Sequence, residues 1–135
     1  MKNWETALKT FLKKYENNPS FEGALLCGSY AWGNQNSFSD IDVNILTSNS
    51  QDWRERGNIK IDDYLVEYFI NPTKQIHQKF RDETKKGIVT CATMFAYGKI
   101  IADKNGYVKK LQKEAKTVLK KTMPKYKATD LALDF

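Results

Sequence analysis

Two aspartates separated by one residue, Asp40 and Asp42, begin an apolar segment that reaches Leu46. If this segment is a strand, its side chains alternate between two faces, so the two carboxylates share one face while Ile41 and Val43 enter the core. Neighbouring carboxylates repel, and each raises the pKa of the other unless a cation lies between them. Proteins bind Mg²⁺ through one or two carboxylates together with waters and substrate phosphates. The pair is therefore a candidate metal site, although paired surface acids are more often simply solvated.

A glycine and a serine, Gly28 and Ser29, directly follow another apolar segment, 21–27, and precede Gly33. Glycine lets backbone N–H groups turn toward a ligand, and the start of a following helix carries a partial positive charge. Together with the Ser29 hydroxyl, these groups could hold a phosphate. The alternative interpretation is a turn glycine, a serine that caps the helix and a glycine that ends it.

An acid also lies inside the apolar segment 59–70, which we predict to be one long strand. Glu67 would share a face of that strand with Asp63 and Leu65. A carboxylate among apolar neighbours is costly unless it is paired with a cation or binds a metal. Glu67 is therefore a third candidate carboxylate, with Asp63 as the alternative. A sheet edge or a salt bridge to lysine would also account for Glu67.

These residues require a scaffold of strands and helices to position them. Apolar residues recur at helical spacing near 2–16 and again from Val108 onward. The polar stretch 47–58 is predicted to be a loop in which Trp53 could begin a turn of helix. The predicted helices are 2–16, a short one after Gly28, 73–86, 89–97 and one from Val108; the predicted strands are 21–27, 41–46, 59–70 and 99–102. The fold class is α/β, a mixed sheet of about four to five strands with helices packed on it.

The composition is that of one ordinary globular domain. The chain has 135 residues, of which 41% are hydrophobic and 28% charged, and no apolar run approaches the ~20 residues of a membrane span. The N-terminus lacks the apolar centre of a signal peptide, so we expect a cytoplasmic protein with both cysteines, Cys27 and Cys91, reduced. Cys27 is expected in the core. The single histidine, His77, excludes a multi-histidine zinc site and is expected at the surface.

The net charge of +6 originates in one segment. Residues 109–127 hold eight lysines and one acid, Glu114, a net of +7, so the rest of the chain sums to −1. We expect most of these lysines to form the solvated face of a core helix. The alternative is an electropositive surface for NTP, RNA or an acidic partner. No aromatic residue is interleaved on the lysine face, so it predicts no stacking surface for single strands, and a nucleic-acid partner is not expected.

Together, the three motifs resemble those of one superfamily. A strand, a Gly-Ser turn, a helix, a loop, Ser-Asp-x-Asp on a second strand and a carboxylate on a third resemble the nucleotidyltransferase superfamily typified by DNA polymerase β. Among its branches, the chain looks most like small bacterial nucleotidyltransferases, including antibiotic-modifying adenylyltransferases and the minimal domains paired with HEPN proteins. The resemblance covers roughly residues 21–72 and, more weakly, 98–111. The residues that carry it are Gly28, Ser29, Gly33, Ser39, Asp40, Asp42 and Glu67.

The resemblance implies a metal-dependent transfer of a nucleoside monophosphate from NTP to a hydroxyl, with release of pyrophosphate. Asp40, Asp42 and Glu67 would be the catalytic residues and would hold Mg²⁺, expected as two ions. Glu67 would act as a metal ligand or as the base for the attacking hydroxyl. A pair of metal ions can stabilise both the attacking and the leaving oxygen of such a displacement.

The resemblance also implies how the nucleotide is bound. Gly28 and Ser29 would hold the β- and γ-phosphates of the donor, expected to be ATP, and Gly33 and Ser39 complete the expected nucleotide-binding set. The acceptor would be a small molecule such as an aminoglycoside, or a tyrosine hydroxyl of a partner protein.

The predicted catalytic domain spans residues 1–127. Residues 128–135 resume an apolar pattern, so we expect a tail that docks on this domain or on a dimer mate, or the start of a missing helical segment. The small size also fits a different function, an antitoxin-like binding module for a HEPN-type partner. A second copy of the chain in a homodimer is a further expected partner.

Overall fold

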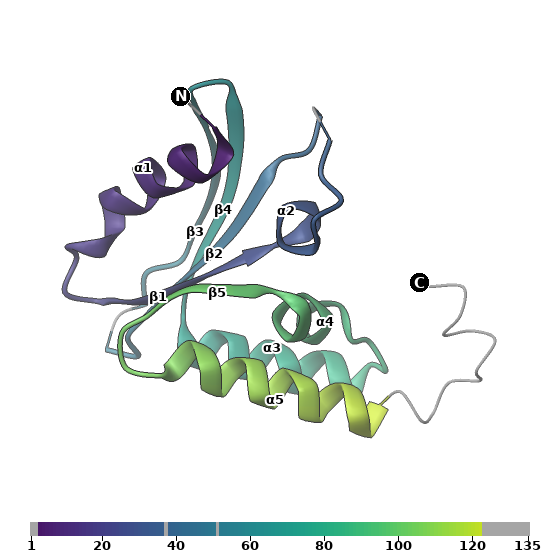
Figure 1. Cartoon of the computed structure of the whole chain (residues 1–135). Coiled ribbons are helices and arrows are strands. Elements are labelled where there is room, and N and C mark those ends of the chain that lie inside the picture. Colours follow the sequence, from purple (N-terminus) through teal and green to yellow (C-terminus); the bar gives the residue numbers. More distant parts are fainter. Residues whose placement is uncertain (1–2, 37, 51, 123–135) are drawn as a thin grey trace.

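A five-stranded sheet forms the centre of the structure (Figure 1). This computed structural model describes residues 3–36, 38–50 and 52–122. The strands are β1 (Phe21–Cys27), β2 (Ile41–Thr47), β3 (Glu55–Ile61), β4 (Tyr64–Pro72) and β5 (Lys99–Asp103). They lie side by side in the order β3-β4-β2-β1-β5. Only β2 and β4 pair in parallel, and the other neighbouring strands are antiparallel. The predicted fold class, α/β with a mixed sheet, is confirmed.

One face of the sheet is covered mainly by the helix α1 (Trp4–Glu16). Its start is capped by Asn3, whose side chain accepts a hydrogen bond from the Thr6 backbone N–H at 2.9 Å. Its apolar residues recur at three- and four-residue steps and therefore lie on one side of the helix. The buried residues of α1 are Ala7, Leu8, Phe11 and Leu12. They pack on the apolar face of β1, β2 and β4.

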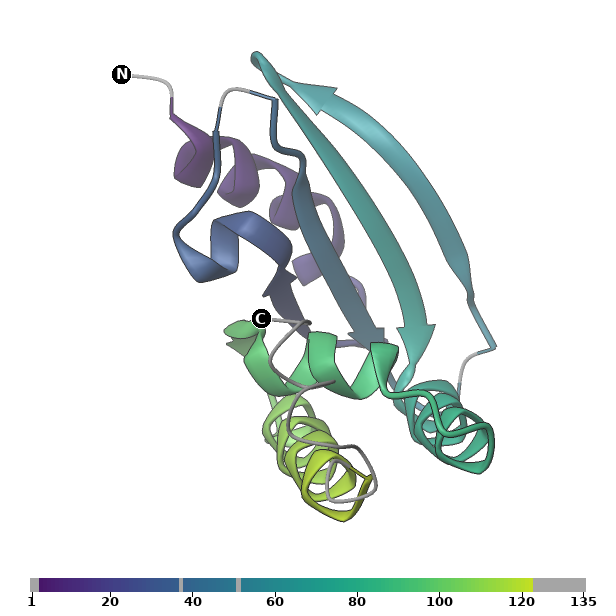
Figure 2. The same ribbon diagram turned by 90° about the vertical axis from the view of Figure 1, so that its right-hand side faces the viewer.

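Three helices cover the other face, but only at one end. They are α3 (Thr73–Lys85), α4 (Thr90–Tyr97) and α5 (Tyr107–Thr122). In Figure 1 they gather below the sheet, and Figure 2 shows β3 and β4 extending well beyond them. Leu25 and Leu46 pack against these helices at the covered end. The rest of this face is left open for polar side chains of β2 and β4.

The predicted long strand 59–70 is wrong, because the chain reverses in its middle. Asp62 has a φ of +55°, and Ile61 and Tyr64 face each other across a tight turn that joins β3 to β4. Aspartate tolerates this left-handed conformation better than most residues. The strand-forming pattern continues on both sides of the turn, which is why the sequence read as one strand.

The predicted loop 47–58 is also wrong in its second half, because β3 already begins at Glu55. Trp53 begins no helix; it lies just before β3, and its ring centroid is 6.1 Å from that of Tyr15 on α1. The strand was missed because its residues are mostly exposed and polar. The remaining predicted elements differ from the structure only at their ends.

Within the part of the chain that the structure describes, no helix is long and apolar enough to cross a membrane. The predicted tail, 128–135, lies outside the described residues.

Candidate active site

The parallel pairing of β2 and β4 places Asp42 directly opposite Glu67. Both side chains are on the face away from α1, since their neighbours Ile41 and Val66 are buried beneath that helix. Asp40 immediately precedes β2, two residues from Asp42, and is partly buried like the other two acids. The structure therefore brings together the three candidate carboxylates. Asp63, the alternative third acid, is exposed in the turn between β3 and β4.

On the other side of Asp42 lies the turn that ends β1, because Cys27 is its register partner. Gly28 follows with a φ of +69°, a conformation that favours glycine. A Cβ at this position would lie 2.5 Å from Asp42 Oδ2. Glycine is thus required twice here, for the backbone conformation and for the close approach of the Asp42 carboxylate.

The carboxylates form an uncompensated negative cluster. The pKa of Asp42 is raised to about 6, chiefly by burial and also by the nearby charges of Glu67 and Asp40. Among the described residues, no donor or cation is hydrogen bonded or ion paired to Asp40, Asp42 or Glu67. A bound cation would remove this repulsion.

The side chains present fit a hard cation such as Mg²⁺. They offer only carboxylate oxygens, without the thiolate or imidazole ligands that favour zinc. Over residues 3–36, 38–50 and 52–122, no three His, Cys, Asp or Glu side chains are grouped closely enough to hold one ion by themselves. Mg²⁺ does not need such a group, because it usually retains waters and takes further ligands from substrate phosphates.

The three remaining predicted residues are placed differently. Ser29 lies in α2 (Gly28–Trp32), beside the carboxylates, and its hydroxyl makes no hydrogen bond to another described residue. Gly33 ends this helix with a φ of +80°, and its N–H donates to the Ser29 carbonyl at 2.9 Å. The Ser39 hydroxyl accepts a hydrogen bond from the Asn36 N–H at 2.9 Å and so closes the loop before Asp40. Gly33 and Ser39 thus have structural roles that need no ligand.

Neither cysteine is available as a nucleophile. Burial raises the pKa of Cys27 to about 12 and that of Cys91 to about 11, so both remain neutral thiols at physiological pH. The Cys27 sulfur accepts a hydrogen bond from Asn44 Nδ2 at 3.3 Å. The expectation that Cys27 is a core residue is confirmed, since its side chain is 2% exposed.

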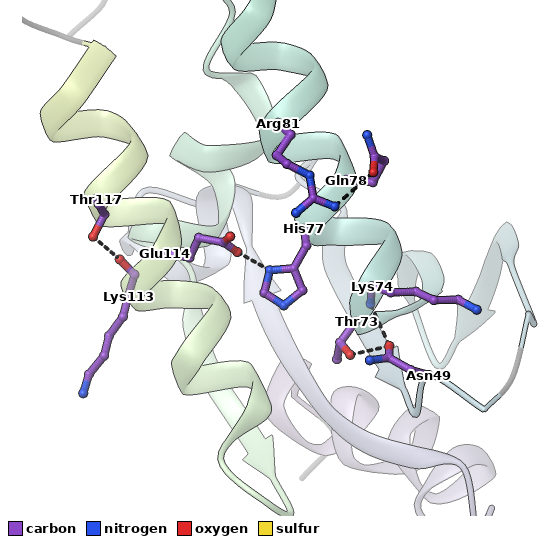
Figure 3. A network of polar contacts seen from close by, with 9 residues as sticks. All are labelled: Asn49, Thr73, Lys74, His77, Gln78, Arg81, Lys113, Glu114 and Thr117. Carbon is purple, nitrogen blue, oxygen red and sulfur yellow. Dashed lines mark hydrogen bonds and ion pairs between the residues drawn. The ribbon is translucent and has the colours of Figure 1, made fainter.

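His77 is partly exposed, in keeping with its expected surface position, but it also has a partner. Its Nδ1 contacts the Glu114 carboxylate, which links α3 to α5 (Figure 3). Both side chains are about one-third exposed. The same figure shows Asn49 accepting hydrogen bonds from Thr73 Oγ1 and the Lys74 N–H at the start of α3. These contacts hold α3 against α5 and against the segment that follows β2.

The predicted site residues do not include the part of β3 that borders Glu67. In the structure Asn58 is the register partner of Glu67, and Arg56 is the partner of Phe69. Arg54 and Arg56 are two apart, the spacing of one strand face. This two-residue spacing could have indicated a strand with both arginines on one face. In a segment predicted to be a loop, the same spacing predicts no shared face.

The comparisons with known proteins agree with this geometry. A family model described as "Polymerase beta, Nucleotidyltransferase" matches residues 7–107. The chain belongs to this family. The match includes the Gly28 turn, both β2 aspartates and Glu67, and it extends beyond the 21–72 region on which the resemblance mainly rested. A search of the curated proteins finds no match.

A solved structure with the same fold is the nucleotidyltransferase-like protein from Exiguobacterium sibiricum 255-15. The TM-score is 0.64 at 14% sequence identity, over 84% of this chain and 39% of that protein. At this identity the likeness concerns the fold alone. The chain therefore spans well under half the length of the protein that it resembles. The predicted superfamily is confirmed.

Proposed function

We propose that the chain is a metal-dependent nucleotidyltransferase that moves a nucleoside monophosphate from NTP, with ATP as the donor, to an acceptor hydroxyl. The observation that carries the proposal is that Asp42 lies opposite Glu67 and against the Gly28 turn, with Asp40 two residues away and no cation of the described chain to neutralise them. Membership of the nucleotidyltransferase family supports the reaction class.

Asp40, Asp42 and Glu67 would hold Mg²⁺ together with oxygens of the substrate phosphates. The positive charge of the metal would stabilise the attacking and leaving oxygens. The Gly28 turn lies directly against the Asp42 carboxylate, so donor phosphates held by the turn would lie beside the metal ligands. The Ser29 hydroxyl, which has no described partner, would donate a hydrogen bond to a phosphate oxygen. The donor nucleotide would therefore bind on the side of Asp42 that faces β1.

In the transfer, a bond forms between the acceptor oxygen and the α-phosphorus, and the bond from that phosphorus to the bridging oxygen breaks. The electron pair of that bond leaves with pyrophosphate. The acceptor proton passes to a nearby carboxylate, for which Glu67 is placed on the side of Asp42 away from the Gly28 turn. Positioning and charge stabilisation are sufficient for such a reaction, and no covalent enzyme intermediate is needed.

The test compares Asp42→Asn with the matched variant Asp63→Asn. Both remove one aspartate charge, but Asp63 is exposed in the β3–β4 turn. Binding of MgATP is measured by isothermal titration, and release of labelled pyrophosphate is measured with a panel of acceptors. Asp42→Asn should lower turnover by about 10³-fold or more, comparable to the loss of a main electrostatic group in other enzymes. Asp63→Asn should remain within about threefold of the wild-type chain.

Wild-type turnover that Asp42→Asn leaves unchanged would refute the assignment. A chain that binds ATP equally well with and without Mg²⁺ would also contradict it, because the three carboxylates would then repel the nucleotide rather than hold it through a metal. Circular dichroism of both variants checks that they are folded.

A further inference from the structure

An open groove with basic walls lies next to Glu67 on the same face of the sheet. Its volume is about 330 Å³. Strand β3 and the residue before it contribute Arg54, Glu55 and Arg56, β4 contributes Phe69 and Asn71, and α3 contributes Lys79. The groove is therefore formed where α3 approaches the outer strands of the sheet.

Two of its cations are held in place by neighbours. Arg54 Nε donates a hydrogen bond to Asn71 Oδ1 at 3.4 Å, and Asn71 is itself only 6% exposed. The Arg56 guanidinium lies 5.3 Å from the centroid of the Phe69 ring, a favourable cation–π arrangement. These contacts leave guanidinium N–H groups at the groove for a ligand.

The acids near these cations accept hydrogen bonds from groups other than the cations. Glu55 accepts hydrogen bonds from the Tyr68 hydroxyl at 2.9 Å and Trp53 Nε1 at 3.4 Å, and Tyr68 packs on the α1 face. Glu83, one turn beyond Lys79 on α3, accepts from the Cys91 N–H at 2.8 Å. Among the residues whose structure is described, none forms an ion pair with Arg54, Arg56 or Lys79. With three cations and one carboxylate among its lining residues, the groove therefore has a net positive charge.

The groove and the Gly28 turn lie on opposite sides of the carboxylates. The strand order places β1 on one side of β2 and β4 with β3 on the other. Phe69 follows Glu67 by two residues on the same face of β4, which is about 7 Å along a strand. A group bound in the groove can therefore present a hydroxyl to Glu67 while the donor occupies the β1 side.

We propose that this groove binds the phosphate groups of the acceptor, so that the acceptor is a phosphate ester carrying a free hydroxyl. The inference rests on the proposed nucleotidyl transfer and specifies its substrate class. Guanidinium groups match phosphate oxygens in geometry and charge, and the partly buried Phe69 ring beneath Arg56 offers an apolar surface to a sugar or base. The same positive charges disfavour a polycationic aminoglycoside as the acceptor. The expected acceptor is instead a phosphorylated small molecule or an oligonucleotide end.

The first experiment measures acceptor binding without transfer. The full chain is titrated, with EDTA and without ATP, with uridine 5′-monophosphate, a uridine hexanucleotide, unphosphorylated uridine and kanamycin. The two phosphorylated probes should bind about tenfold or more tightly than uridine and kanamycin. Arg56→Gln/Lys79→Gln should weaken their binding about tenfold or more, whereas Arg56→Lys should retain part of it. The matched control, Lys113→Gln/Lys116→Gln on the exposed side of α5, should change it less than twofold.

Equal binding of phosphorylated and unphosphorylated probes would overturn the inference, and so would equal losses in the groove and α5 variants. Comparison of the mononucleotide with the hexanucleotide distinguishes a small phosphorylated acceptor from a polymer end. Thermal unfolding of each variant identifies any loss that comes from misfolding, and Arg56→Lys then provides the binding comparison in a folded chain.

The second experiment measures transfer with MgATP and the probe that binds best. The groove variants should raise the acceptor KM about tenfold or more with little change in kcat, and an unchanged KM would overturn the acceptor role. If the wild-type chain transfers nothing, the proposed function has failed while the binding titrations still test the groove. If transfer occurs with uridine as well as with its phosphate, the proposed function stands and the phosphate requirement is wrong.

Discussion

The two faces of β2 have opposite chemistry although they belong to the same seven residues. On the α1 face Ile41, Val43 and Ile45 are fully buried in the core. On the other face the residues change along the strand, from the half-buried Asp42 to Asn44 and then Leu46. Strand geometry permits this division, because successive side chains point to opposite faces of the sheet.

The difference shows how a small domain combines a core with a charged site. The α1 face supplies stabilising burial along the whole length of β2. On the other face, burial increases toward the helices: Asn44 donates to the Cys27 sulfur, and Leu46 is covered completely. Asp42 lies where the helices no longer cover the sheet, so its charge is tolerated and remains open to ligands.

The largest predicted effect comes from a charge on the wrong face. Val43→Asp places an unpaired carboxylate at a position with 0% exposure, which should cost about 3–5 kcal/mol or more and unfold much of the protein at room temperature. Leu65→Asp is the matched control, since Leu65 is 41% exposed on the face that carries Glu67 and should lose less than about 1 kcal/mol. Urea unfolding measures both. Similar losses would mean that the two faces do not differ as described.

The next effect concerns the glycine beside Asp42. Gly28→Ala combines a left-handed backbone with a Cβ only 2.5 Å from the Asp42 carboxylate, so we expect a loss of about 2–4 kcal/mol. Gly33→Ala has a similar φ, +80°, but nothing within 4 Å of its Cβ, and should lose only about 1 kcal/mol.

A double-mutant cycle isolates the contact from the backbone strain. In an Asp42→Ala background the cost of Gly28→Ala should fall toward that of Gly33→Ala, because the clashing oxygen is gone. Additive losses in thermal unfolding would show that Gly28 is not pressed against Asp42.

A smaller and opposite effect is expected when the Asp42 charge itself is removed. The pKa of Asp42 is raised in the folded protein, to about 6 from 3.8, so its contribution to stability is fully present below pH 4 and is lost as pH rises through about 6. Without metal, Asp42→Asn should therefore unfold at nearly the wild-type temperature at pH 4 and at a higher temperature at pH 8. Because the group is only half-buried, the gain should be about 1 kcal/mol or less.

The control for this pH series is Asp63→Asn, whose carboxyl is exposed in the β3–β4 turn; it should show no such divergence between pH 4 and pH 8. Mg²⁺ should stabilise the wild-type chain more than Asp42→Asn above pH 6. A wild-type chain more stable than Asp42→Asn at pH 8 in EDTA would contradict the description of an uncompensated cluster.

The smallest effect is expected at the contact between His77 of α3 and Glu114 of α5. Glu114→Gln weakens the contact with His77 that joins α5 to α3, and partly exposed pairs of this kind contribute about 0.5 kcal/mol. Lys113→Gln, on the neighbouring exposed position, should change the unfolding temperature less. A loss above about 2 kcal/mol for Glu114→Gln would mean that the open face depends on this pair for its shape.

Local pattern was sufficient for much of the fold and for the identity of the site residues. The alternation around Asp40 and Asp42 predicted their shared face, and the glycine after an apolar segment predicted the turn at Gly28. Local pattern failed at Asp62. The residues before and after the turn both have high β propensity, so the sequence does not distinguish two strands joined by a turn from one continuous strand. It also failed at Arg54 and Arg56, since an exposed polar edge strand resembles a loop.

The sequence by itself determined the residue types that can do chemistry, their order along the chain and the family to which they belong. Only the tertiary structure decided which of them meet, since the parallel pairing of β2 and β4 sets Asp42 against Glu67 rather than against Asp63. It also formed the basic groove, from β3, β4 and α3. The physical reason is that register and helix coverage arise from packing between segments distant in sequence, and the side chains of one segment alone do not encode them.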